Sequence, residues 1–304
     1  MIIFTIFADK LPMMWTKPYN MREGFLIGGG LIIVGLILQL SVGSIDWDAF
    51  RWPVNGIVLA GFLSIIAIIF FLRKKVYGFQ FIGTYLAAIP ALLYAVVLTT
   101  IMGFTNTQML SFWPFVLFYV YIAVILGQII IRRTLHFQWK RDIPFLLNHL
   151  GLFLAITTAT LGNADMQRLK MITVKGEPEW RAVNGQSMIV EMPIAIELKA
   201  FIMETYDDGS PRRFASDIQI LTKSGKNIQT TVEVNKPVEV DGWKIYQYGY
   251  DTQMGAMSQT SILELVSDPW LPLVYTGIYM MLGGALCMFV FGTRREKPIR
   301  RKRV

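Results

Sequence analysis

Six stretches of mainly apolar residues restrict this chain to membrane-embedded folds. They cover residues 24–43, 56–72, 79–104, 112–131, 143–162 and 270–292. Each is about as long as a helix must be to cross the hydrocarbon core of a bilayer. Hydrophobic residues make up 54% of the sequence, which is more than soluble domains usually carry. The sequence therefore predicts an α-helical integral membrane protein with six transmembrane helices.

Basic residues gather in alternate connections between these stretches. Arg73, Lys74 and Lys75 follow the second stretch, more basic residues lie between the fourth and fifth, and the tail reads TRREKPIRRKRV. In contrast, residues 163–269 hold 15 acidic and 11 basic side chains. By the positive-inside rule, both termini are expected in the cytoplasm and residues 163–269 outside. This distribution accounts for the net charge of +8. We expect the basic tail to contact membrane lipid, and we expect no binding to nucleic acid.

The same pattern divides the chain into five expected segments. Residues 1–23 form a cytoplasmic or interfacial segment, 24–162 five transmembrane helices, 163–269 a periplasmic β-rich domain, 270–292 the sixth helix, and 293–304 a basic cytoplasmic tail. The first helix is not expected to be a cleaved signal peptide, because it begins after some two dozen residues and lacks a small-x-small cleavage site.

The segment 163–269 has the alternating pattern of β-strands. Ile194, Ile196 and Leu198 alternate with Ala195, Glu197 and Lys199, and a similar alternation runs through residues 228–235. Apolar residues at every second position predict strands with one buried face. Asp241-Gly242 suits a tight hairpin turn. We therefore expect an extracytoplasmic antiparallel β domain, inserted between the fifth and sixth helices.

Three tyrosines recur at alternate positions near the end of this domain. Tyr246, Tyr248 and Tyr250 lie in the sequence WKIYQYGY. Because side chains alternate between the two faces of a strand, we expect all three on one face of the sheet. Packing within the sheet is the simpler explanation. Contact with a partner protein is the alternative, and it makes these tyrosines the candidates for a partner-facing surface.

His149 is an ionisable residue within the fifth apolar stretch. It lies about six residues from the start, or roughly 9 Å along a helix. Ionisable side chains at that depth lose hydration, so they line cavities, pair with other groups or bind ligands. A structural hydrogen bond to a neighbouring helix is the alternative. The helical repeat surrounds His149 with an apolar wall of candidate slot residues: Phe145, Leu146, Leu152, Phe153 and Ile156.

A neutral imidazole in such surroundings suits two kinds of chemistry, namely a proton relay or axial ligation of haem iron. A relay needs further acids or bases within the membrane, and the apolar stretches contain almost none. Haem ligation needs one imidazole on each side of the porphyrin. The other histidine, His136, lies in a basic loop where a solvated side chain is expected. A second ligand would therefore come from another polypeptide.

The residues required for several other kinds of functional site are absent from the sequence. Residues 163–269 contain neither histidine nor cysteine, which excludes the usual zinc, copper and iron ligand sets from that segment. The single cysteine, Cys287, lies in the last apolar stretch, so a disulfide within the external domain is excluded. The sequence also has no Walker loop, dinucleotide fingerprint, nucleophile elbow or HExxH motif. Nucleotide-driven and hydrolytic activities therefore have no support.

Three longer motifs carry a resemblance to a known family. They are NHLGLFLAITTATLG at residues 148–162, VNKPVEVDGWKIYQYGY at 234–250 and SDPWLPLVYTGIYMMLGG at 267–284. In this order, the motifs resemble those of the ResB proteins, also called CcsB, of the type II cytochrome c maturation system. The resemblance covers roughly residues 79–292 and leaves the first two helices as an added amino-terminal pair.

The resemblance implies a function in haem delivery. ResB proteins act with a CcsA/ResC subunit as a haem exporter and cytochrome c synthase. It implies that His149 is an axial ligand of transported haem b and that the partners are a CcsA/ResC-like subunit and apocytochrome c. It also implies location in a bacterial inner membrane. The tryptophan-rich segment and outer histidines of CcsA are absent here, so the chain is expected to be a component of the synthase, without catalysis of its own.

Two other functions stay open on the residues alone. A membrane-anchored scaffold would use the outer β domain to recruit partner proteins without binding haem, and His149 would then be structural. A small transporter or proton-coupled permease is the third possibility. The shortage of charged residues within the apolar stretches argues against it.

Overall fold

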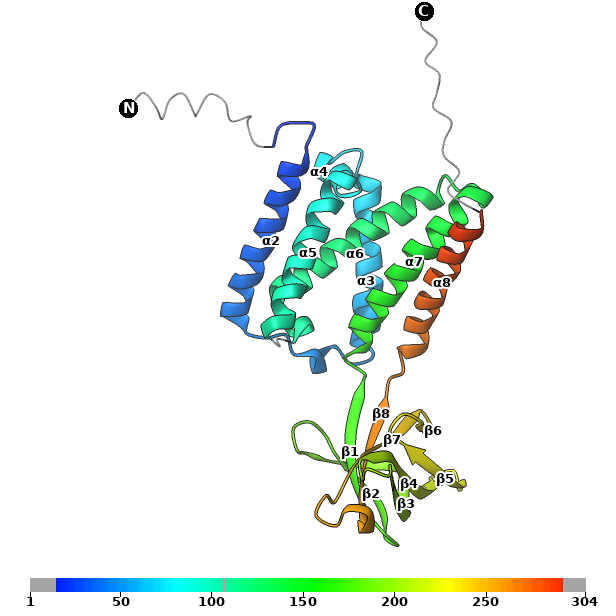
Figure 1. Ribbon diagram of the computed structural model, residues 1–304. Helices are drawn as coiled ribbons and strands as arrows, with labels where there is room; N and C mark the ends of the chain where they lie inside the picture. Colours follow the sequence, from blue (N-terminus) through cyan, green and yellow to red (C-terminus); the bar gives the residue numbers. More distant parts are fainter. Residues whose placement is uncertain (1–14, 106–107, 292–304) are drawn as a thin grey trace, which may run out of the picture. The chain divides into compact units, whose positions relative to one another are not determined.

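The structure, a computed structural model, describes residues 15–105 and 108–291 (Figure 1). It divides into a helical unit, which extends to Ala164 and resumes at Leu271, and a sheet unit that covers Asp165–Trp270. Six helices among the described residues are long and apolar enough to cross a membrane. The prediction of six transmembrane helices is thereby confirmed. The expected tail at 293–304 and residues 1–14 of the expected amino-terminal segment lie outside the described residues.

Within residues 15–105 and 108–291, the helical unit contains six long helices and three short ones. The long helices are α2 (Met21–Val42), α3 (Val54–Leu72), α5 (Tyr85–Thr105), α6 (Trp113–Thr134), α7 (Trp139–Gly162) and α8 (Leu271–Phe291). The short elements are η1 (Trp47–Phe50), α4 (Tyr77–Ile82) and η2 (Met109–Ser111).

The third apolar stretch forms two helices, so the single span expected at 79–104 is wrong at its beginning. Gly83 and Thr84 separate α4 from α5. Glycine is a poor helix former, and the Thr84 hydroxyl donates a hydrogen bond to the carbonyl oxygen of Phe81 at 2.7 Å. This side chain competes locally with helical hydrogen bonding. The apolar pattern continues across the break because both helices bury apolar residues.

Glycines of α2 allow close packing against α5. A β-carbon added to Gly24 would lie 2.6 Å from the carbonyl oxygen of Leu86. Leu86 precedes Pro90 by four residues, and proline has no N–H to complete the helical hydrogen bond to that carbonyl. Gly24 therefore brings the backbone of α2 close to the point where α5 has lost a hydrogen bond.

The sheet unit consists of eight antiparallel strands. They are β1 (Gln167–Val174), β2 (Pro178–Val183), β3 (Ile189–Thr205), β4 (Pro211–Thr222), β5 (Asn227–Glu233), β6 (Val238–Val240), β7 (Trp243–Tyr250) and β8 (Thr260–Ser267), with the short helix η3 (Gly255–Met257) before β8. Their order across the sheet is β5-β4-β3-β2-β1-β8-β7-β6. The sheet lies in sequence between α7 and α8, so the predicted insertion of an antiparallel β domain between the fifth and sixth long helices is confirmed.

The inner face of the sheet forms one apolar core. Ile194, Ile196 and Leu198 are buried as their alternation predicts, and they share this core with residues of β4, β7 and β8. The Ser216 hydroxyl of β4 donates to Gln247 Oε1 of β7 at 2.6 Å. Because β4 and β7 are not neighbours in the strand order, the sheet must curve so that its inner faces meet.

The turn between β6 and β7 has the predicted residues in the required backbone conformation. Asp241 has φ 47° and Gly242 has φ 84°, and the flanking residues Val240 and Trp243 are directly paired. Two successive residues with positive φ are typical of the type I′ hairpin turn, which aspartate-glycine favours. This short turn fixes the start of β7 and hence the positions of its tyrosines.

Candidate functional site

Helix α7 carries His149 and begins four residues before the predicted stretch. Asp142 caps its first turn, since its carboxylate accepts the N–H of Gln138 at 2.8 Å. The carboxylate is fully buried, and Arg133 and Arg141 approach it at 2.6 and 2.8 Å. A buried charge needs such partners to offset its lost hydration. The pairing with Arg133 connects the end of α6 to the beginning of α7 and thereby orients the segment that leads to His149.

The imidazole of His149 is held by the preceding turn of its own helix. Its Nδ1 lies 2.8 Å from the carbonyl oxygen of Phe145, and the two rings stack with centroids 3.8 Å apart. Because a carbonyl oxygen only accepts hydrogen bonds, Nδ1 must carry the proton. The lone pair then resides on Nε2. Histidines that bind metals are commonly oriented by this kind of Nδ1–H to carbonyl bond.

The hydrogen bond of His149 differs from the one expected for a purely structural histidine. The sequence allowed a hydrogen bond to a neighbouring helix, whereas the bond found is to Phe145 on the same helix. The ring is half-buried. In the described part of the chain, Nε2 has no hydrogen-bond partner. The contacts therefore fix the ring in place and leave one nitrogen available.

The apolar residues around His149 differ in their surroundings. Phe153 is only 9% exposed and packs in the helical core, with its ring stacked on that of Phe62. Ile156 is packed against the same core. Leu152 is 40% exposed, and Leu146 is half-buried. Phe145 is thus the candidate in direct ring contact with the imidazole, and the role of the five as a haem slot stays a prediction.

A close contact between backbones joins α7 to α8. A β-carbon on Gly151 would lie 2.6 Å from the carbonyl oxygen of Gly277. Asn148 lies against Gly284 on the same pair of helices, and its amide donates to the carbonyl oxygen of Pro144 at 2.8 Å. Small residues permit such close approach between membrane helices. This interface fixes the face of α7 next to His149, and apolar periodicity alone did not identify it.

Arg133 extends the contacts of His149 toward the charged end of the helices. Its guanidinium carbon lies 5.3 Å from the centre of the Phe145 ring, on whose ring His149 stacks. The arginine also pairs with Asp142 at 2.6 Å. The sequence alone did not predict this connection. The signal that was present was a lone acidic residue beside several basic ones, which does not specify which cation pairs with it.

The structure separates the three tyrosines of β7, so their expected placement on one face is wrong. A β-bulge shifts the register between Gln247 and Gly249. The extra residue makes Tyr250 pair with the buried Ser261, and its ring stacks on Phe201 and Phe214 at 4.8 and 5.2 Å.

The tyrosines before and within the bulge remain on the other side. Tyr248 is 54% exposed, with the Lys170 ammonium 3.8 Å from its ring centre. Tyr246 is half-buried and pairs with Glu264 of β8. Tyr246 and Tyr248 therefore stay candidates for a partner-facing surface, whereas Tyr250 belongs to the packing of the sheet.

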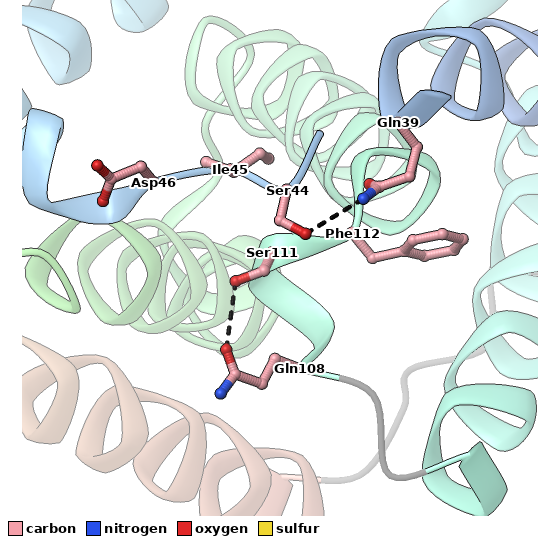
Figure 2. Close-up of a pocket in the computed structure, with 7 residues that line it drawn as sticks. All are labelled: Gln39, Ser44, Ile45, Asp46, Gln108, Ser111 and Phe112. Carbon is pink, nitrogen blue, oxygen red and sulfur yellow. Dashed lines mark hydrogen bonds between the residues drawn. The ribbon is translucent and has the colours of Figure 1, made fainter. Parts of the chain in front are cut away.

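A cavity of about 510 Å³ lies elsewhere in the helical unit, where the segment after α2 meets the one before α6 (Figure 2). Its polar groups are largely engaged with one another. Gln39 accepts the backbone N–H of Trp113 at 3.1 Å, and its amide donates to Ser44. Gln39 thus caps the beginning of α6. The residues that line this cavity include none of the predicted site residues: Gln39, Ser44, Ile45, Asp46, Gln108, Ser111 and Phe112.

The region that contains His149 is similar to a known protein family. The family model of the ResB-like family matches residues 141–262, a shorter region than the resemblance suggested. A cytochrome c biogenesis protein CcsB from Prochlorococcus marinus subsp. pastoris is 27% identical over 116 residues, which are 38% of this chain and 26% of that protein. The match thus spans about a quarter of the length of that relative.

A comparison of structures finds a similar chain described as cytochrome c heme lyase CcmF. The identity is 15% and the TM-score is 0.38, with 90% of this chain and 46% of that chain covered. Similarity at this level supports no conclusion about this protein. The family match, in contrast, includes most of α7 and most of the sheet unit. Residues 141–262 of this multi-pass membrane chain are thus similar to the ResB-like family.

Proposed function

We propose that this chain holds haem b as cargo in the membrane and presents it for attachment to apocytochrome c, together with a CcsA/ResC-like subunit. The observation that carries the proposal is the state of His149. Its Nδ1 is engaged by the Phe145 carbonyl at 2.8 Å, which leaves Nε2 as the basic nitrogen. This is the form of imidazole that binds iron.

The residues next to His149 suit the binding of a flat apolar group. Phe145 stacks on the imidazole at 3.8 Å and limits its rotation, while Leu146 and Leu152 contribute apolar surface that is not fully buried. An axial ligand that is already oriented loses less conformational freedom on binding. His149 would hold the iron, and Phe145 would fix the plane of the imidazole.

A second axial ligand would come from the partner subunit. Among the described residues, no group of three or more histidine, cysteine or acidic residues is arranged to hold a metal ion. The other histidine, His136, is exposed in the connection between α6 and α7. Shared ligation would make haem retention depend on the assembled subunits. Haem is the group that apocytochrome c would receive. Its covalent attachment would be carried out by the complex of this chain with the CcsA/ResC-like subunit.

The charge distribution supports an orientation for the proposed assembly. The basic connections after α3 and α6 would face the cytoplasm, whereas residues 163–269 would lie in the periplasm. In this arrangement both chain termini are cytoplasmic and the membrane is the bacterial inner membrane. The sheet unit would then lie on the side where apocytochrome c receives haem, with Tyr246 and Tyr248 as candidates for contact with partners.

The test is haem retention by the full chain co-purified with a CcsA-like subunit. His149→Gly should abolish the share of Soret absorbance that depends on this chain, and added imidazole should restore it. His136→Gly is the matched control because it removes the exposed histidine, and its spectrum should be that of the wild type. An unchanged spectrum in His149→Gly, with the complex intact, would contradict haem binding and favour the scaffold function.

A further inference from the structure

Two arginines at the ends of neighbouring helices lack an acidic partner. Arg73 follows the last residue of α3, and Arg132 lies in the last turn of α6. Both are only partly exposed. In the part of the chain that the structure describes, neither forms an ion pair with a carboxylate, although Arg133 and Arg141 share Asp142. Two partly desolvated cations are thus left without a counter-charge.

The environment of Arg73 makes this lack of a partner costly. Its Nη1 is buried and has no hydrogen-bond acceptor among the described residues. The guanidinium carbon lies 3.5 Å from the centre of the Phe70 ring, which holds the group against an apolar surface. A buried donor of a charged group loses its hydrogen bonds to water and needs a replacement. An acceptor from outside the chain would meet that need.

Arg132 lies over the break between α4 and α5. A β-carbon on Gly83 would lie 2.6 Å from Arg132 Nη2, so the absence of a side chain at Gly83 leaves room for the guanidinium. The first turn of α5, which begins two residues later, carries the positive end of the helix dipole. The positive charge of Arg73 also acts on Arg132. These like charges repel one another unless an anion lies between them.

The surrounding surface combines basic and apolar groups. Lys74 and Lys75 are exposed directly after Arg73. Phe71 and Leu72, which precede it, are 77% and 37% exposed. A phosphate bound by arginines at the end of a membrane helix, with apolar side chains beside it, matches the headgroup and acyl chains of a phospholipid. Basic pockets between transmembrane helices bind such headgroups, and arginine forms paired hydrogen bonds to phosphate.

We propose that Arg73 and Arg132, whose guanidinium lies against Gly83, form a binding site for the phosphate of an anionic phospholipid. The site is independent of haem binding by His149. The bound lipid would neutralise the two arginines and hold the end of α3 against α6 and the α4–α5 break. It would thereby stabilise the helices at the same end of the bundle as the Arg133–Asp142 pair.

The experiment measures lipid binding to the delipidated full chain by native mass spectrometry, with phosphatidylglycerol and inorganic phosphate as separate probes. The double variant Arg73→Gln/Arg132→Gln should bind phosphatidylglycerol roughly tenfold more weakly, as expected from the loss of charged hydrogen bonds. The variant Lys74→Gln/Lys75→Gln removes the same charge from adjacent exposed positions and should bind nearly as the wild type does. Gly83→Ala keeps all charges but displaces Arg132 Nη2, so it should also weaken binding.

Three outcomes would overturn the site. Equal losses in the two double variants would indicate diffuse attraction to the basic surface. Unchanged binding in Arg73→Gln/Arg132→Gln would exclude the arginines. Inorganic phosphate that binds as tightly as the lipid would show a free-anion site. Thermal unfolding without lipid checks that the variants fold. Arg73→Gln/Arg132→Gln should be at least as stable as the wild type, because it no longer has the repulsion between these two positive charges.

Discussion

Gly151 of α7 and Gly277 of α8 meet backbone to backbone, since a β-carbon on Gly277 would lie 2.5 Å from the Gly151 carbonyl oxygen and 2.7 Å from the Ala155 nitrogen. The Gly151 oxygen and the Ala155 nitrogen are backbone atoms of α7, so they cannot move away without a shift of that helix. This contact places α8 beside the turn of α7 that follows His149. The geometry around the imidazole therefore depends on two glycines that are far apart in the sequence.

Replacement of Gly277 by alanine should destabilise the helical unit. Overpacking in a close-packed interior typically costs about 1–3 kcal/mol. Gly283→Ala is the matched control, because a β-carbon on this glycine of the same helix meets nothing within 4 Å. The measurement is thermal unfolding in detergent. Equal melting temperatures for the two variants would mean that α7 and α8 do not pack through these glycines.

The buried polar cluster of the sheet should be sensitive to loss of its central amide. Gln247 accepts hydrogen bonds from Ser216 and Ser261 at 2.6 and 2.9 Å and donates to the Gly249 carbonyl at 2.8 Å. Gln247→Leu removes acceptors from buried hydroxyls, which costs about 1–3 kcal/mol. Gln229→Leu, at an exposed position of β5, should change little. Denaturation followed by β-sheet circular dichroism tests the difference.

Tyr248, within the bulge, and Tyr250, after it, should behave differently. Tyr250→Ala removes a ring that stacks on Phe201 and Phe214 and should destabilise the sheet by about 2–4 kcal/mol. Tyr248→Ala removes an exposed ring and should leave stability nearly unchanged. If Tyr248 faces a partner, this second variant should instead recover less of the CcsA-like subunit on co-purification. Equal loss of stability in both variants would contradict the assigned register.

Acid should weaken one ion pair of the sheet. Arg181 hydrogen-bonds the carboxylate of Glu179 at 2.8 and 2.9 Å and lowers the pKa of Glu179 from 4.5 to about 2. Because the folded pKa lies below the unfolded one, the pair contributes its full stability above about pH 4.5. That contribution is lost as pH falls toward 2.

The matching variant is Glu179→Gln, which should melt slightly below the wild type at pH 7. The difference in melting temperature should shrink as pH falls from 4.5 toward 2, since the wild type then loses the same interaction. The pair is largely solvent-exposed on the arginine side, with 56% of the Arg181 side chain accessible, so the effect should be small. A difference that does not vary with pH would exclude the pair as its cause.

Features that depend on neighbouring residues in the chain were predictable. The presence of six long apolar helices, the alternation around Ile194 and the Asp241-Gly242 turn agree with the structure. Each follows from local length, period or turn chemistry, which act within a few residues.

Three local features were also not predictable from apolar length and periodicity alone. A single extra residue in β7 moved Tyr250 to the inner face, and a glycine with a threonine ended the short helix before α5. The partner of His149 also differed, because the nearest acceptor proved to be the carbonyl of its own preceding turn.

The sequence by itself determined a six-helix membrane chain with an inserted antiparallel sheet and a histidine within its fifth helix, because hydrophobic length and periodicity are local properties. Only the tertiary structure decided that Gly151 meets Gly277, that Asp142 is shared by Arg133 and Arg141, and that Arg73 and Arg132 have no carboxylate among the described residues. Such pairings are set by close packing and charge compensation between segments far apart in the chain, which no local pattern records.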